Sequence, residues 1–115
     1  MRKAPIQVTH GSCSIDRDGC ATSPNYPLDY GSNQACTFQA SGILIKSVDF
    51  QTESGYDKLT VNTQTYSGNI GPAAVHVTGS MSWTSDSSVQ KRGWKICPTV
   101  PTEVTTATTV LGVVF

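Results

Sequence analysis

The sequence predicts an all-β fold, an antiparallel β-sandwich, from two observations. Short β-branched and aromatic runs, broken by Gly, Ser, Asn and Pro, recur along the chain, and no stretch carries apolar residues at helical spacing over several turns. The 115 residues include four cysteines with no C-x-x-C pair, which favours two disulfides over a zinc site. Such cross-links help a domain this small, because it buries a limited fraction of its surface.

The elements follow from alternation and turn residues. The longest predicted strand covers 42–50, where alternation separates Leu44 from Ile43 and Ile45. Shorter strands are predicted at 59–61, 75–77, 81–83 and 93–97, with a hairpin over 62–68. The large apolar residues of these strands form the expected core: Phe38, Ile43 or Leu44, Phe50, Leu59, Val61, Trp83, Trp94 and Ile96.

The chain divides into a loose N-terminal extension over 1–12, a domain over 13–97 and a tail over 98–115. Two prolines and six threonines between residues 98 and 109 predict a polar, disordered tail. The apolar stretch 110–115 is far shorter than the roughly 20 residues of a membrane-spanning helix. It is either a loose end or the start of a truncated transmembrane segment or further domain, and we expect membrane contact only in the transmembrane case.

Composition and motifs exclude several classes of function. The formal net charge is zero, 14% of residues are charged, and no basic stripe exists, so we expect no nucleic-acid binding. The chain has no G-x-S-x-G elbow, no phosphate-binding glycine loop and no evident pair of nucleophile and base. We therefore expect no enzymatic activity.

Short motifs follow one order along the chain: Ser23-Pro24-Asn25-Tyr26-Pro27, Tyr30, Cys36-Thr37-Phe38, Phe50-Gln51-Thr52-Glu53, Tyr56-Asp57-Lys58-Leu59-Thr60-Val61, Trp83-Thr84-Ser85-Asp86-Ser87-Ser88 and Gly93-Trp94-Lys95-Ile96. In this order they resemble a CUB domain, an extracellular β-sandwich of jelly-roll type that serves as a recognition module. The resemblance covers about residues 13–97. The chain departs from the family in the short Ser54-Gly55 stretch after Glu53 and in lacking the family's second disulfide.

The resemblance implies a site for one Ca²⁺ ion. By position, Glu53, Asp57 and Asp86 match the carboxylate ligands, Ser88 a further oxygen ligand, and Tyr30 a tyrosine that hydrogen-bonds the acidic cluster. Calcium prefers such oxygen ligands, and a cation relieves the repulsion between crowded carboxylates. The alternative is that Glu53 and Asp57 are ordinary turn charges.

The resemblance also bears on the disulfides. Cys36 matches the family's second cysteine, whose natural partner is Cys13. Cys20 and Cys97 alternate with apolar neighbours, so both are expected to face outward and to bridge the first and last strands. We predict Cys13–Cys36 and Cys20–Cys97, with Cys13–Cys97 and Cys20–Cys36 as the alternative.

The expected function is therefore a non-enzymatic, calcium-binding recognition module of a larger protein, secreted or on the outer side of the cell surface. Its expected partner is a protein with basic side chains or an extracellular glycan. The alternative is a metal-free sandwich that binds carbohydrate or serves a structural role. A response of thermal unfolding to calcium and chelator separates the two.

Overall fold

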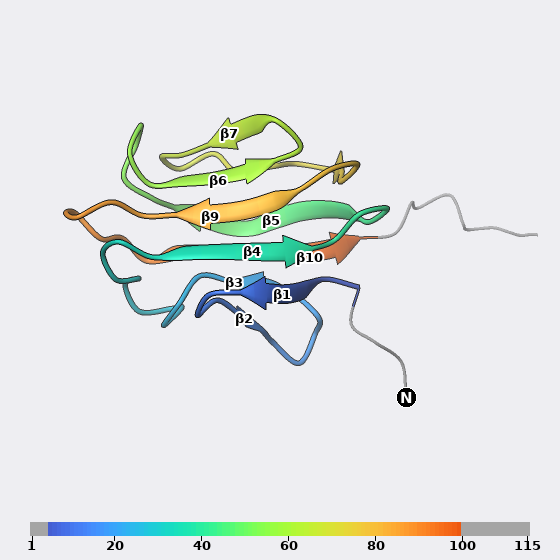
Figure 1. Ribbon diagram of the computed structural model, residues 1–115, viewed down its shortest axis with the longest axis horizontal. Coiled ribbons are helices and arrows are strands. Elements are labelled where there is room, and N and C mark those ends of the chain that lie inside the picture. Colours follow the sequence, from blue (N-terminus) through green and yellow to red (C-terminus); the bar gives the residue numbers. More distant parts are fainter. Residues whose placement is uncertain (1–4, 100–115) are drawn as a thin grey trace, which may run out of the picture.

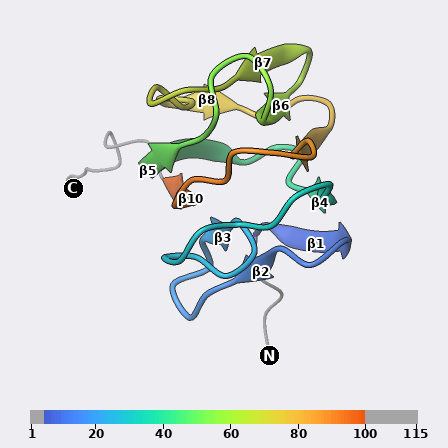
Figure 2. The ribbon, with the colours of Figure 1, turned by 90° about the vertical axis from the view of Figure 1, so that its left-hand side faces the viewer.

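The computed structural model describes residues 5–99, which form two five-stranded antiparallel sheets packed face to face (Figure 1). Sheet A has the strand order β1-β4-β9-β6-β7, and sheet B has the order β2-β3-β10-β5-β8. Figure 2 shows the two layers end on. The prediction of an all-β antiparallel sandwich is confirmed.

Most strands are short, as the sequence predicts. In chain order the strands are β1 (Gln7–His10), β2 (Ser14–Ile15), β3 (Ala21–Thr22), β4 (Ala35–Gln39), β5 (Leu44–Gln51), β6 (Lys58–Val61), β7 (Gln64–Tyr66), β8 (Val75–His76), β9 (Met81–Thr84) and β10 (Gly93–Thr99). A two-residue turn, in which Asn62 has a φ of 61°, joins β6 to β7, and this is the hairpin expected over 62–68. Asparagine tolerates such a positive φ better than most residues.

Strand β5 departs from simple alternation. Ile45 and Phe50 are both buried, although strict alternation would place residues with this odd spacing on opposite faces of the strand. The register explains it, because Lys95 pairs with Asp49 and the next residue, Ile96, pairs with Ser47. Val48 is the extra residue of this bulge and is 58% exposed. Ile45, rather than either predicted candidate, is therefore the fully buried residue at the start of β5.

Aromatic side chains connect the two sheets in the core. Trp83 of sheet A lies edge-on to Trp94 of sheet B with ring centroids 5.8 Å apart, and Tyr30 and Phe38 extend the cluster on either side. Such edge-to-face pairs add to the burial of large apolar surfaces. The other predicted core residues are also buried: Phe38, Phe50, Leu59, Val61 and Ile96.

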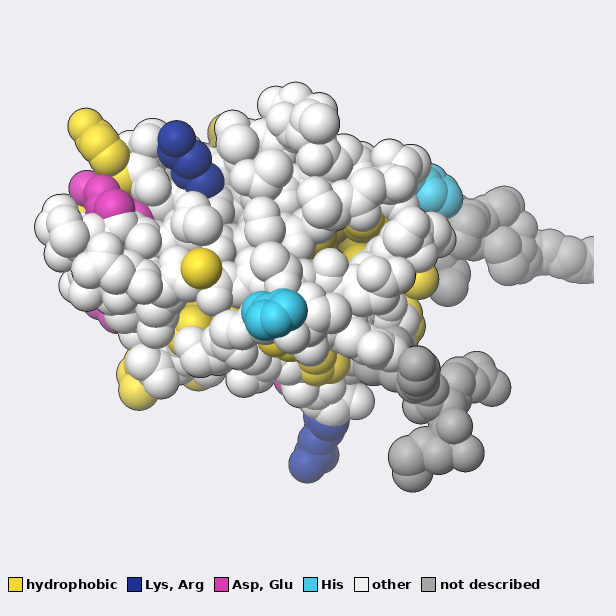
Figure 3. Space-filling model, viewed as in Figure 1, with side chains coloured by type: hydrophobic (Ala, Val, Ile, Leu, Met, Phe, Trp, Pro, Cys, Tyr) yellow, Lys and Arg dark blue, Asp and Glu magenta, His cyan; other side chains and the backbone are white. Residues whose placement is uncertain are grey.

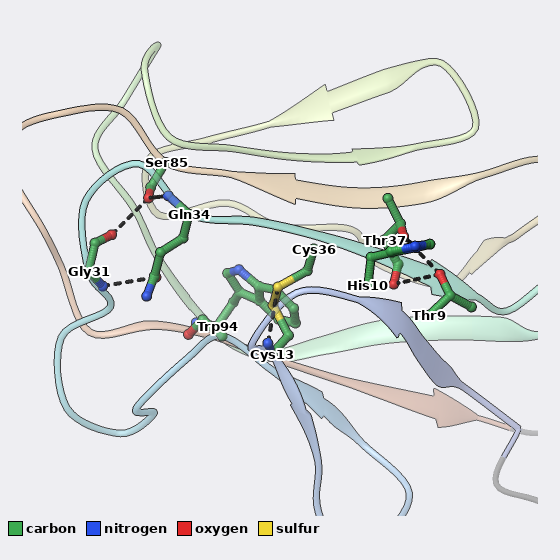
Figure 4. The surroundings of a disulfide bond; sticks show 10 residues. Thr9, His10, Cys13, Gly31, Gln34, Cys36, Thr37, Ser85 and Trp94 are labelled. Atoms are coloured by element: carbon green, nitrogen blue, oxygen red, sulfur yellow. Dashed lines mark hydrogen bonds between the residues drawn. A yellow bond between two sulfur atoms is a disulfide. The ribbon is translucent and has the colours of Figure 1, made fainter.

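Both predicted disulfides are present. Cys13–Cys36 joins the segment after β1 to β4 beside Trp94 (Figure 4), and Cys20–Cys97 joins the start of β3 to β10. Gly11, with a φ of 96°, lets the chain pass closely over the first bridge, since a Cβ there would lie 2.1 Å from the carbonyl oxygen of Ala35. The expected outward orientation does not leave Cys20 exposed to solvent. Cys20 lies on the outer side of sheet B but is only 3% exposed, because the Asp16–Gly19 turn folds back on its backbone.

The domain begins earlier than the sequence suggested. Residues 7–10 form edge strand β1 of sheet A, and Ile6 is fully buried, so the predicted loose extension over 1–12 is wrong for these residues. The apolar side chains of Ile6 and Val8 explain the difference, because both pack into the core. Of the predicted tail, Pro98 and Thr99 end strand β10, and residues 100–115 lie outside the described part of the chain. No helix within residues 5–99 is long and apolar enough to cross a membrane.

Candidate metal centre at the loop end of the sandwich

Three loops meet at the left-hand end of the sandwich in Figure 1. Strands β5 and β9 end there and β4, β6 and β10 begin there, so the loops 23–34, 52–57 and 85–92 are brought together although they are far apart in sequence. The space-filling view shows acidic side chains gathered at this end (Figure 3). Each loop supplies one part of the candidate site.

Asp57 is the fixed centre of this site. It is fully buried, and its two carboxylate oxygens accept hydrogen bonds from the Tyr30 hydroxyl at 2.6 Å and the Asp86 backbone N–H at 2.8 Å. A turn over 53–57, closed by the Asp57 N–H donating to the Glu53 carbonyl at 3.0 Å, sets its position. Gly55 has a φ of 83°, which suits the tight reversal. Each oxygen keeps a lone pair free for a cation.

Tyr30 links its own loop to the loop that carries Glu53 and Asp57. Its hydroxyl donates to Asp57 and accepts the Glu53 backbone N–H at 3.2 Å, while its ring packs edge-on against Trp83. Burial, together with the hydrogen bond to Asp57, raises the pKa of Tyr30 well above its usual range. The phenol therefore stays protonated and remains a hydrogen-bond donor at physiological pH.

Glu53 completes the cluster despite the shortened loop. Ligand oxygens of Glu53, Asp57 and Asp86 all lie within 4.8 Å of one another. The Glu53 Oε1 atom is buried and has no hydrogen-bond partner among the described residues. Desolvation first, and then the negative charges of Asp86 and Asp57, raise the pKa of Glu53, while Lys91 acts in the opposite direction. The cluster thus holds more negative charge than its surroundings neutralise.

Hydrogen bonds to the first loop, from both backbone and side-chain groups, hold the third loop in place. Asn33 donates its N–H to the Asp86 carbonyl at 2.8 Å, and the Ser85 hydroxyl accepts from the Gln34 N–H and donates to the Gly31 carbonyl (Figure 4). Sequence reasoning missed Ser85 and Gln34, because a serine or glutamine in a polar loop carries no signal of its own. Their role appears only once two loops lie side by side.

Ser88 and Thr52 have different places in the site. Ser88 is exposed and donates its backbone N–H to an Asp86 carboxylate oxygen at 3.1 Å, so its role as a ligand stays a prediction. Thr52, which sequence reasoning missed, is buried, and its hydroxyl donates to the Asp57 carbonyl at 2.9 Å and accepts the Gly68 N–H. Thr52 therefore fixes the backbone that carries Asp57.

A groove of about 500 Å³ adjoins the acidic cluster. Glu53 and Ser54 form part of its wall, with Asn69, Val89 and Lys91 among the other lining residues. Val89 is 48% exposed and Tyr56, next to Asp57, is 63% exposed. The acidic cluster therefore opens next to a surface that offers both apolar and polar contacts.

Two known proteins are similar to this chain. Protein SpAN of Strongylocentrotus purpuratus is 30% identical over an alignment 121 positions long, which covers 86% of this chain and 20% of that protein. Adhesion G-protein coupled receptor G6 of Danio rerio is 33% identical over an alignment 105 positions long, which covers 74% of this chain and 9% of that receptor. The chain thus spans a fifth or less of the length of these relatives. The second name describes an adhesion receptor, and the first states no activity.

No family model matches the chain, and no solved structure matches it. The chain is thus related to segments of much longer proteins, and its fold is an all-β sandwich with two disulfides.

Proposed function

We propose that residues 13–97, extended by β1 at the N-terminal side, form a CUB-like recognition module that binds one Ca²⁺ ion through Glu53, Asp57 and Asp86. The observation that carries this proposal is the buried, unpartnered Oε1 atom of Glu53 beside two further carboxylates. A buried polar atom without a partner is costly, and a cation supplies the missing interaction.

The donor set suits calcium. The cluster consists only of carboxylates, the oxygen ligands that Ca²⁺ prefers. Two ligands of one ion lie at most about 5 Å apart when each bond is about 2.3–2.6 Å, and the oxygen atoms of the cluster lie within 4.8 Å of one another. Ser88 and backbone carbonyls of the loops are the further ligands in this proposal. Bound calcium supplies positive charge at the cluster, and Tyr30 and Asp86 orient Asp57 towards it.

An extracellular, non-enzymatic role fits this chemistry. Two disulfides among the described residues favour an oxidising compartment, and one relative is an adhesion receptor by name. The groove beside Glu53 gives a partner with basic side chains, or an extracellular glycan, a surface next to the ion. The domain is then one module of a longer secreted or cell-surface protein.

Calcium titration tests the proposal. We expect calorimetry to detect one site, and we expect calcium at a hundredfold excess over its Kd to raise the free energy of unfolding by about 2.7 kcal/mol relative to chelator. Glu53→Gln should abolish both effects, since the amide keeps the shape of the side chain and removes its charge. The control is Asp18→Asn at an exposed position of the Asp16–Gly19 turn, which should leave both unchanged.

Glu53 is a better test position than Asp57, because Asp57 also accepts two hydrogen bonds that hold the loops together. Absence of binding at millimolar calcium in the folded parent protein would overturn the proposal. The domain is then a metal-free carbohydrate-binding or structural sandwich.

A further inference from the structure

The position of the Cys20–Cys97 disulfide relative to the chain ends has a mechanical consequence. Strand β1 begins and strand β10 ends at the same right-hand end of the sandwich (Figure 1). A load that pulls the two ends apart therefore acts across the strands. Hydrogen bonds of an antiparallel ladder lie perpendicular to the strands, so such a load breaks them one pair at a time.

The pairing of β10 with β5 is where this peeling would start. Thr99 pairs with Leu44 at the open end of the ladder, and Pro98, which pairs with Ile45, has no N–H to donate. The next residue inward is Cys97, whose sulfur is bonded to Cys20. Peeling from the C-terminal side thus meets a covalent bond after two residues.

On the N-terminal side, load passes from Pro5 along β1 to Cys13 and on to Cys20. From Cys20 it crosses the disulfide to Cys97 and leaves the domain. The register explains why the bridge lies there: Ala21 pairs with Ile96, so the flanking residues Cys20 and Cys97 face each other on neighbouring antiparallel strands. The residues between them, a sequence separation of 77, lie outside the load path.

We propose that Cys20–Cys97 is a mechanical clamp that lets tension pass through the domain without unfolding strands β3 to β9, which lie between the two cysteines. The clamp keeps tension off the acidic cluster, since Glu53, Asp57 and Asp86 all lie between the two cysteines. The loop end keeps its geometry while the chain on either side is under tension. Cys13–Cys36 does not do this, because the chain continues from Cys13 directly to Cys20.

The lengths released under load follow from the two bridges. With the clamp intact, the described chain on the load path is about 17 residues, or at most about 60 Å when extended. Without the clamp, the load can extend the chain between Cys20 and Cys97, a separation of 77 residues. Cys13–Cys36 still closes a separation of 23 residues, which is subtracted from that length. The difference is about 55 residues, or roughly 190 Å.

Single-molecule force spectroscopy on the full chain, held by its first and last residues in calcium-free buffer, tests the clamp. We expect the parent protein and Cys13→Ser/Cys36→Ser to share the short limit, and Cys20→Ser/Cys97→Ser to extend about 190 Å further. Residues outside 5–99 add the same length to every variant. Because calcium is left out, the result does not depend on the proposed metal site.

A second measurement removes the need for the double variant to fold. Dithiothreitol added to the loaded parent protein reduces the bridge to two thiols and is itself oxidised to its cyclic disulfide. If Cys20–Cys97, which bears the load, is cut first, we expect a step of about 190 Å and then a step of about 80 Å from the 23-residue separation when Cys13–Cys36 is cut. If Cys13–Cys36 is cut first, we expect no step from it and one step of about 270 Å when Cys20–Cys97 is cut. Full extension without reductant, or no long step on reduction, would overturn the proposal.

Discussion

Asp49 and Glu53 lie four positions apart at the end of β5 and just beyond it, yet their surroundings are opposite. Asp49 accepts two hydrogen bonds from the Arg92 guanidinium, at 2.7 and 2.8 Å, and one from the Tyr26 hydroxyl at 2.7 Å. Glu53 faces two other carboxylates, and its buried Oε1 has no donor. A carboxylate with its own cation stabilises the fold by itself, whereas a carboxylate among acids leaves a place for an added cation.

The pKa shifts express the same contrast. The Arg92 guanidinium holds the pKa of Asp49 below its usual value, while desolvation and neighbouring acids raise the pKa of Glu53. Each carboxylate region also contains a tyrosine: burial and then the bond to Asp49 raise the pKa of Tyr26 to about 12. Paired substitutions at the two regions therefore separate a structural carboxylate from a binding one.

The largest expected effect is the difference in stability loss between phenylalanine substitutions at the two tyrosines. Tyr30→Phe leaves buried Asp57 without one donor and the Glu53 N–H without its acceptor, so we expect a loss of about 1.5–3 kcal/mol in the free energy of unfolding. The matched control Tyr26→Phe should cost less than about 1 kcal/mol, because Asp49 is partly exposed and keeps Arg92. Urea denaturation of both variants measures the difference. Equal losses would show that the two carboxylates depend on their tyrosines alike.

The second comparison concerns the sign of the effect in chelator. Asp49→Asn removes a charge paired with Arg92 and should lower stability by at most about 1 kcal/mol, since the pair is partly exposed. Glu53→Gln removes a charge that repels Asp57 and Asp86, so it should raise stability. Thermal unfolding in chelator measures both shifts. A loss of stability in Glu53→Gln would mean that repulsion within the cluster is unimportant.

The smallest effect is the dependence on pH. The pKa of Asp49 is lowered by folding, so its contribution is present above about 3.8 and is lost as pH falls through the lower folded value. The folded pKa of Glu53 lies above 4.5, so in chelator the protein loses stability as pH rises from about 4.5 through that higher value. Denaturation from about pH 2 to about pH 8 should show both slopes.

Each slope has its own variant as control. Asp49→Asn should remove only the pH dependence of stability below about 3.8. Glu53→Gln should remove only the pH dependence of stability above about 4.5. If both variants flatten the same window, the two carboxylates titrate as one group and the contrast between them fails.

Some features of the fold were accessible from local sequence patterns. Alternation placed Phe38, Leu59 and Val61 in the core because a strand with one buried face repeats every two residues. The bulge at Val48 broke that rule, since an extra residue is dictated by the pairing with β10 and leaves no mark in the strand itself. Strand β1 was missed for a similar reason: its register against β4 depends on residues far along the chain.

The sequence by itself determined the all-β class and most of the core, because these depend on residue type and spacing. The preferred cysteine pairing and the candidate acidic residues came from the resemblance of its ordered motifs to the CUB family. Only the tertiary structure decided that the three acids lie within 4.8 Å of one another, that Thr52 and Ser85 hold the loops around them, and that the Cys20–Cys97 bridge lies on the path between the two ends of the domain. The physical reason is that strand direction and register, set by burial of the whole core, bring loop ends together across long separations in the chain.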